Sequence, residues 1–115
     1  MAKLIRLERD QLLLQEGATS TCMYWIQKGQ LVVSKTSANG EIVLGHLGSG
    51  ELVGEISFLD NQPRSASVKA LTDCELLEIP QDAIENIFKT QPKWLEILVK
   101  TLAERLRKTN SKIKI

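Results

Sequence analysis

Short hydrophobic runs fill the first two-thirds of the chain, and each run stops at a glycine, a proline or a polar stretch. The runs occupy 12–14, 23–26, 31–33, 42–44 and 74–79, and an alternating segment occupies 65–70. Turn signals recur roughly every 8–12 residues, a spacing typical of an all-β roll or sandwich and not of alternating strands and helices. We therefore expect a strand in each of these six segments.

The polar stretch Ser37-Ala38-Asn39-Gly40 separates two of these runs. Asn-Gly between β-branched segments is a strong hairpin signal, because both central residues of a type I′ turn need a positive φ. The sequence therefore predicts a hairpin with Asn39 and Gly40 at the centre of its turn.

The hydrophobic period changes after Pro80. Gln81–Thr90 has the pattern of an amphipathic helix, and Pro92 suits the first turn of a second helix. The second helix carries large apolar residues that fall together on one face at helical spacing. They are Leu95, Leu98, Val99, Leu102 and Leu106. This face packs either on the chain's own strands or against a second copy of the chain.

The chain of 115 residues, with 43% hydrophobic and 25% charged residues, matches the size and composition of one folded domain (1–115). We expect an α+β fold that is mainly β, with a β-roll at about 5–80 and two C-terminal helices at about 81–110. No segment approaches the ~18–20 apolar residues of a membrane span, and the charged N-terminus does not resemble a signal peptide. Cys22 and Cys74 lie far apart without a CxxC motif, which favours two reduced thiols over a redox pair. A cytoplasmic protein is therefore expected.

Charge is distributed unevenly. Residues 1–99 carry 9 basic and 13 acidic side chains, whereas residues 100–115 carry 6 basic and 1 acidic. The cationic end is explained either by a solvated helix C-terminus, which the helix dipole favours, or by nucleic-acid binding. The first explanation is preferred. The basic residues concerned are Lys100, Arg105, Arg107, Lys108, Lys112 and Lys114.

Catalytic chemistry is poorly supported. The only histidine, His46, has no cluster of metal ligands or serine-protease partners beside it in the sequence. The glycine-rich segment 45–54 lacks the lysine of a phosphate-binding P-loop, so we interpret Gly45, Gly48 and Gly50 as residues of tight turns.

The segment 54–68 has a different character. Gly54 permits close approach of a ligand to the backbone, and the apolar run that follows it can form one helical turn with free N–H groups. Arg64 follows ten residues later, after Pro63. A helix start, the carboxylate of Glu55 and a guanidinium together suit a sugar phosphate. The structural alternative is a surface ion pair between Glu55 and Arg64.

This segment resembles the phosphate-binding cassette of the cyclic nucleotide-binding domain family, whose pattern runs G-E-[hydrophobic]-[small]-x-[hydrophobic]…P-R-[STA]-A. The matching residues are Gly54, Glu55, Ile56, Ser57, Leu59, Pro63, Arg64, Ser65 and Ala66. The similarity extends over nearly the whole chain. It implies a jelly-roll (double-stranded β-helix) β-roll, a short cassette helix and two C-terminal helices.

The resemblance also implies a role for each site residue. Arg64 would pair with the cyclic phosphate and Glu55 with the ribose 2′-hydroxyl. Backbone amides would come from Gly54, Ile56, Ser57 and Ala66, and the Ser65 hydroxyl would reach the phosphate or the base. The last helix would cover the base through Thr109, next to Asn110, where some bacterial members have a serine supplied by the partner subunit.

By this resemblance the chain is a non-catalytic sensor domain that binds cAMP, or alternatively cGMP, and needs no cofactor or metal. It would signal through its C-terminal helix, form a homodimer there and act on an output domain or partner that this chain does not include. The alternative is a degenerate or nucleic-acid-associated dimerisation module that binds no nucleotide.

Overall fold

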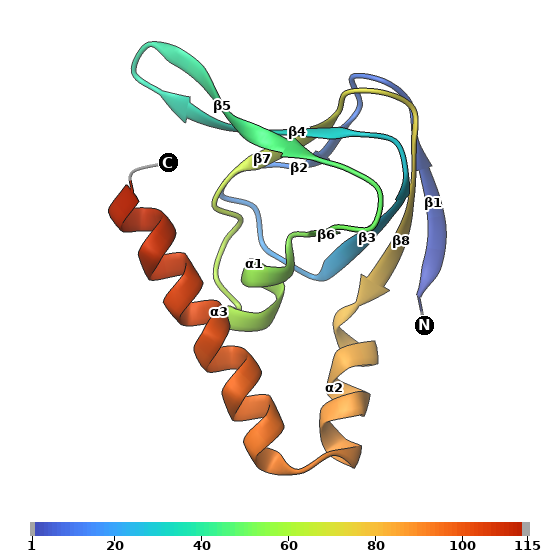
Figure 1. The fold of residues 1–115 in the computed structure, drawn as a ribbon, viewed down its shortest axis with the longest axis vertical. Helices are drawn as coiled ribbons and strands as arrows, with labels where there is room; N and C mark the ends of the chain where they lie inside the picture. Colours follow the sequence, from blue (N-terminus) through green and yellow to red (C-terminus); the bar gives the residue numbers. More distant parts are fainter. Residues whose placement is uncertain (1, 114–115) are drawn as a thin grey trace.

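The computed structural model describes residues 2–113, with side chains as far as Thr109. Eight strands come first in chain order, interrupted by one short helix, and two longer helices follow (Figure 1). The strands are β1 (Lys3–Leu7), β2 (Leu12–Leu14), β3 (Cys22–Lys28), β4 (Leu31–Ser37), β5 (Gly40–Leu47), β6 (Leu52–Val53), β7 (Ser67–Ala70) and β8 (Cys74–Pro80). The helices are α1 (Glu55–Asp60), α2 (Gln81–Thr90) and α3 (Lys93–Ile113).

The strands pair in a nested, antiparallel order. β1 pairs with β8, β2 with β7, β3 with β6 and β4 with β5. Two further pairings, β3 with β8 and β4 with β7, join the strands into two four-stranded sheets. Nesting of this kind is what a long hairpin produces when it folds over on itself, so the domain is the expected jelly-roll β-roll. The predicted mainly β, α+β class is confirmed.

The core lies between the two sheets. Its most completely buried side chains are those of Ile26, Leu31, Val53 and Leu76. Cys74 belongs to this core, Cys22 is half-buried, and both thiols are free.

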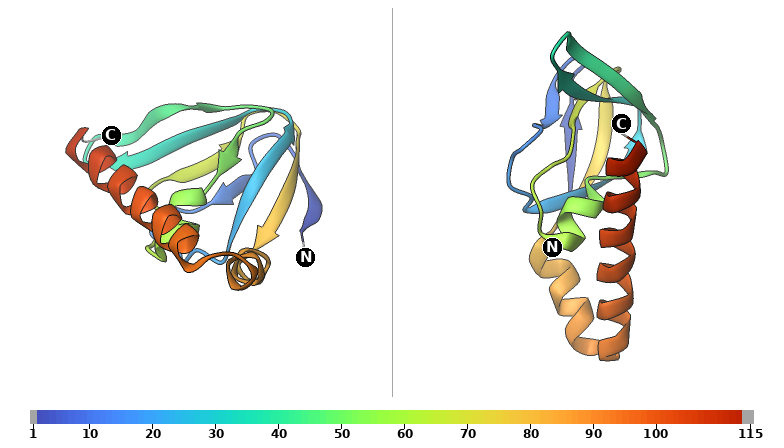
Figure 2. Two further views of the ribbon diagram at one scale, coloured as in Figure 1. Left: turned by 60° about the horizontal axis from the view of Figure 1, so that its bottom comes forward. Right: turned by 90° about the vertical axis from the view of Figure 1, so that its left-hand side faces the viewer.

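Helix α1 connects the short strand β6 to the segment that leads into β7, and it packs against α3 (Figures 1 and 2). The predicted helix at 81–90 is confirmed with the same bounds. Pro92 stands just before α3, and its carbonyl accepts the N–H of Leu95. None of the described helices is both long and apolar enough to cross a bilayer.

The predicted β4–β5 hairpin is present, but its turn is not type I′. Ser37 pairs with Gly40, so the two central residues are Ala38 and Asn39. Gly40 (φ 107°) is the only one of these four residues with a positive φ. This geometry fits a type I turn followed by a glycine bulge, which also matches the twist of the strands.

The apolar residues of α3 do not share one environment. Leu95 and Val99 are half-buried, whereas Leu98, Leu102 and Leu106 are exposed. Their helical spacing keeps these residues on one side of α3, as predicted, but the chain itself covers only part of that side. α3 contacts the rest of the domain along a narrow stripe of its surface. Its exposed large apolar side chains include, besides the three leucines, those of Trp94 and Ile97.

Candidate functional site

A cavity of about 170 Å³ lies where β6, α1 and the segment before β7 meet. It is lined by seven of the nine residues that the sequence singled out: Gly54, Glu55, Ile56, Ser57, Arg64, Ser65 and Ala66. Its remaining walls are apolar side chains and strand residues of the β-roll: Leu14, Val33, Leu47, Leu52, Val53 and Val68. We call this the inner cavity. The lining of the inner cavity therefore combines polar groups with an apolar surface.

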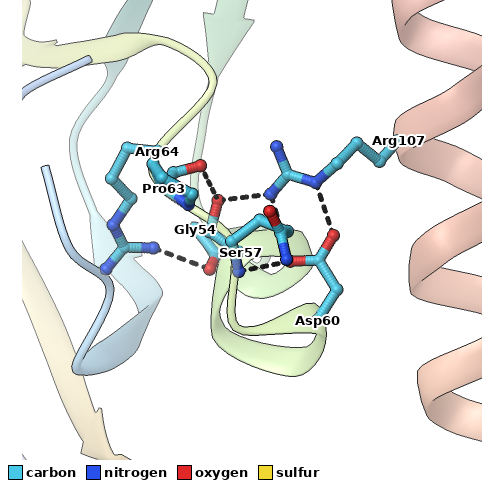
Figure 3. Close-up of polar contacts among 7 residues, drawn as sticks. Gly54, Ser57, Asp60, Pro63, Arg64 and Arg107 are labelled. Atoms are coloured by element: carbon cyan, nitrogen blue, oxygen red, sulfur yellow. Dashed lines mark hydrogen bonds and ion pairs between the residues drawn. The ribbon is translucent and has the colours of Figure 1, made fainter. Parts of the chain in front are cut away.

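Arg64 is the most unusual residue of the inner cavity, since only 5% of it is exposed. Its Nη1 donates to the carbonyl of Gly54 at 2.8 Å (Figure 3). Its Nη2 donates to the carbonyl of Cys22 at 2.6 Å. Two backbone bonds, with Gly17 and Ala18, fix its main chain. The structural alternative, a surface ion pair between Glu55 and Arg64, is therefore not what the structure has: Arg64 is buried and binds carbonyl groups.

The charge of Arg64 is not neutralised by a salt bridge within the described part of the chain. Burial lowers the pKa of the guanidinium, while the nearby Cys22, Tyr24 and Glu55 oppose this effect. An arginine nevertheless stays protonated at neutral pH. A buried cation held only by neutral carbonyls is well suited to an incoming anion.

The structure explains why position 54 is a glycine, which the sequence did not reveal. Its φ is +75°, and a Cβ at this position would lie 2.3 Å from Nη1 of Arg64. The sequence suggested that Gly54 makes room for a ligand, but in this structure it makes room for the arginine. The glycine and the arginine of the cassette thus depend on each other.

Helix α1 begins directly at Glu55. Its first helical bond runs from the N–H of Phe58 to the carbonyl of Gly54, so the N–H groups of Glu55, Ile56 and Ser57 have no acceptor within the helix. Glu55 is half-buried and lines the inner cavity. These amides and the guanidinium of Arg64 supply donors to one cavity.

A second cavity of about 430 Å³, the outer cavity, shares Val33, Leu47, Ile56, Ser65 and Ala66 with the inner one. The other lining residues come from the β4–β5 hairpin and from α3: Lys35, Leu44, Gly45, His46 and Arg107. The two cavities are therefore adjacent, and we refer to them together as the two-compartment cleft. Gly45 lies within β5 and not in a turn, so that part of the prediction was wrong.

The C-terminal helix reaches this cleft with a different residue from the one predicted. Thr109 is exposed and lines neither cavity, and the side chain of Asn110 lies outside the described residues. Arg107 lines the outer cavity instead. The sequence placed Arg107 in the cationic end of the chain, although its spacing of four from Ala103 and eight from Val99 puts it on the inward face of the helix.

A larger hollow of about 850 Å³ surrounds the turn between β1 and β2 and shares no lining residue with the cleft. Basic and acidic side chains are mixed along it, so it does not select one sign of charge. No group of three or more potential metal ligands occurs among the residues that the structure describes.

Comparison with known proteins agrees with the geometry. The model of the cyclic nucleotide-binding domain family matches residues 4–91. The cAMP-activated global transcriptional regulator CRP of Haemophilus influenzae is 34% identical over 103 residues, which cover 88% of this chain and 46% of that protein. Patatin-like phospholipase domain-containing protein 6 of Pongo abelii is 30% identical over 87% of this chain and 7% of its own. The chain thus spans about half the length, or less, of these relatives.

Solved structures show the same similarity. The cAMP-bound form of the EAL enzyme Bd1971 superposes with a TM-score of 0.85 and 35% identity, covering 97% of this chain and 30% of that one. Its cGMP-bound form gives a TM-score of 0.78 and 36% identity over 91% of this chain and 28% of that one. The catabolite activator protein of Thermus thermophilus gives a TM-score of 0.78 and 29% identity over 98% and 54%.

Proposed function

The chain belongs to the cyclic nucleotide-binding domain family, and on this basis we propose that it binds cAMP, with cGMP as the alternative ligand, in the two-compartment cleft. The phosphate and ribose occupy the inner cavity and the base occupies the outer one. The domain is a non-catalytic sensor.

The buried and unpaired charge of Arg64 carries this proposal. A guanidinium that is 5% exposed and whose bonds to the described residues go only to the carbonyls of Gly54 and Cys22 is costly to keep unless an anion neutralises its charge. Its planar fork matches two oxygens of a phosphate, and a charge-assisted hydrogen bond of this kind contributes about 1.5–3 kcal/mol. The free amides of α1 supply donors for the same anion.

Glu55 and Ser65 complete the inner compartment. The carboxylate of Glu55 accepts a hydrogen bond from the ribose 2′-hydroxyl, and the amide of Ala66 approaches the phosphate from the side opposite α1. The Ser65 hydroxyl reaches the phosphate or the base. Apolar residues of the β-roll line the rest of this cavity, which suits the uncharged faces of a sugar.

The preference for cAMP rests on relatives. One is named as cAMP-activated, and the solved structures include cAMP-bound and cGMP-bound forms of a similar domain. The outer cavity offers Lys35, His46 and Arg107 as polar neighbours of a purine. Direct competition between the two nucleotides decides the base preference.

Signalling runs through α3. Its exposed leucines, at positions 98, 102 and 106, offer an apolar face for a parallel homodimer. An output domain or partner protein would respond to the position of this helix. Nucleic acid is not proposed as a partner of this segment, since Lys100 and Arg107 are engaged with Glu96 and Asp60. The two free thiols suit the cytoplasm.

Calorimetric titration with cAMP, cGMP and 5′-AMP tests the proposal. We expect both cyclic nucleotides to bind and 5′-AMP to bind far more weakly, because a non-cyclic phosphate carries more charge and a different shape. No heat with either cyclic nucleotide up to about millimolar concentration, where the binding free energy is only ~4 kcal/mol, would sink the proposal.

A ligand-side control tests Glu55 without disturbing the buried arginine. Glu55→Ala and 2′-deoxy-cAMP each remove one partner of the same hydrogen bond, so together they should weaken binding no more than either change alone. Fully additive losses would mean that Glu55 does not contact the 2′-hydroxyl.

A further inference from the structure

Arg107 ties the C-terminal helix to the cassette helix. Its Nε and Nη2 both donate to the carboxylate of Asp60, the last residue of α1, the second bond at 3.2 Å (Figure 3). Nη2 also donates to Oγ of Ser57 at 2.8 Å. The side chain of Asp60 is only 2% exposed and that of Arg107 is 23% exposed, so water screens this pair weakly.

Further hydrogen bonds connect this pair to the segment that carries Arg64. Ser57 Oγ donates to the carbonyl of Pro63 at 3.2 Å, and Pro63 directly precedes Arg64. Oδ1 of Asp60 accepts a further bond from the N–H of Gln62 at 3.0 Å. One cluster therefore connects α3, α1 and the loop that carries the buried arginine.

No other side chain within the described part of α3 makes a polar contact with another element. Lys93 and Lys100 pair with Glu96 of the same helix, so these ion pairs do not connect α3 to the rest of the domain. The remaining contact between α3 and the domain is apolar and includes the buried Ala103. Apolar contact fixes the position of a helix loosely, whereas a two-pronged guanidinium–carboxylate pair fixes both distance and orientation.

We infer that Arg107 and Asp60 form a latch that holds α3 over the outer cavity and slows the release of ligand. Arg107 also lines that cavity, so the side chain that holds α3 in place is itself part of the wall around the ligand. The ligand can leave only after α3 moves away, and this movement breaks the bonds to Asp60 and Ser57. Asp60 and Arg107 are positioning residues in this scheme, which rests on the proposed function for its ligand.

The ligand-free protein gives the first test. Arg107→Gln and Asp60→Asn should each speed amide hydrogen exchange in residues 101–109 at least fivefold, since opening of the helix no longer breaks charged bonds. Arg105→Gln is the matched control, because Arg105 lies on the same helix, is exposed and makes no side-chain hydrogen bond or ion pair with any other described residue. Exchange in the two latch variants equal to that of the control would overturn the latch.

Ligand release gives the second test. Stopped-flow displacement of a fluorescent cAMP analogue should show dissociation roughly 10–150-fold faster in Arg107→Gln and Asp60→Asn, the loss expected for about 1.5–3 kcal/mol of charged bonds. Association should change less than threefold. Arg107→Lys keeps the charge but loses the second prong, so its dissociation should lie between those of Arg107→Gln and the original protein.

These outcomes separate the inference from the proposed function. If the unmodified protein binds no cyclic nucleotide, the proposed function and the release step fail together, while the exchange experiment still judges the latch. If it binds and the variants release ligand at the unmodified rate, the inference is wrong and the proposed function stands.

Discussion

Replacing Gly54 with alanine tests the most specific packing claim of the site. The substitution forces a side chain onto a residue with φ of +75° and places its Cβ 2.3 Å from Nη1 of Arg64. The left-handed conformation alone costs about 1–2 kcal/mol. The guanidinium must also withdraw by about 0.7 Å to reach the 3.0 Å below which real Cβ contacts are essentially never seen. That movement strains or breaks its 2.8 Å bond to the carbonyl of Gly54, worth about 1.5–3 kcal/mol.

Gly50→Ala is the matched control. Gly50 has a similar φ of +91°, and a Cβ there would meet nothing within 4 Å. Gly50→Ala therefore carries the free-energy cost of the left-handed conformation without displacing any side chain. The difference between the two variants isolates the clash with Arg64.

Urea unfolding and cAMP titration of both variants measure the effect. We expect Gly54→Ala to be less stable than Gly50→Ala by about 1.5–3 kcal/mol and to bind cAMP roughly 10–150-fold more weakly. Gly50→Ala should bind like the original protein. Equal stability and equal affinity in the two variants would show that Gly54 does not support Arg64.

Three further predictions concern the core, the pH response and the dimer. Leu76→Ala removes a side chain with no exposed surface and should lower the free energy of unfolding by about 2–5 kcal/mol, as urea titration measures. Burial, followed by the neighbouring Cys22 and Glu78, raises the pKa of Tyr24 above its ordinary value near 10. Above about pH 10 the Tyr24 hydroxyl loses its proton in the unfolded chain but keeps it in the folded protein, so the free energy of unfolding falls as the pH rises. A Tyr24→Phe variant should therefore lose less stability between about pH 8 and pH 11. In a sedimentation experiment Leu102→Glu should convert the dimer to a monomer. Ile87→Glu, at an exposed position of α2, should leave the dimer intact.

The cassette could be predicted from the sequence because its residues are close together in the chain. Gly54 through Ala66 form one segment, so a local pattern was enough to bring seven residues to one cavity. The partners of Arg64 were missed, because the carbonyl of Cys22 comes from a strand 42 residues earlier. Charge chemistry suggested Glu55 as the partner, but in a fold the backbone carbonyls compete for the same donors.

Other failures also reflect tertiary structure. Arg107 looked like part of a solvated cationic tail until α1, 47 residues earlier, was placed beside it. Strand β6 has only two residues, too few for any alternation, and it exists because β3 provides its partner. The one-residue shift of the hairpin turn followed from the pairing of Ser37 with Gly40, which the Asn-Gly dipeptide alone does not determine.

The contacts of Arg107 set the position of α3 from which this domain signals. The bonds to Asp60 and Ser57 lie within the chain and involve no ligand atom, so they favour the closed position of α3 before any ligand binds. If they contribute about 3 kcal/mol, they change the populations of the two positions by roughly 150-fold. A ligand shifts α3 further only by the difference between its free energies of binding to the two positions, and a shift from 1:99 to 99:1 needs about 5.5 kcal/mol. A stronger switch would require a further contribution, and the exposed leucines of α3 can supply it if a second copy of the helix packs against them only in the closed position.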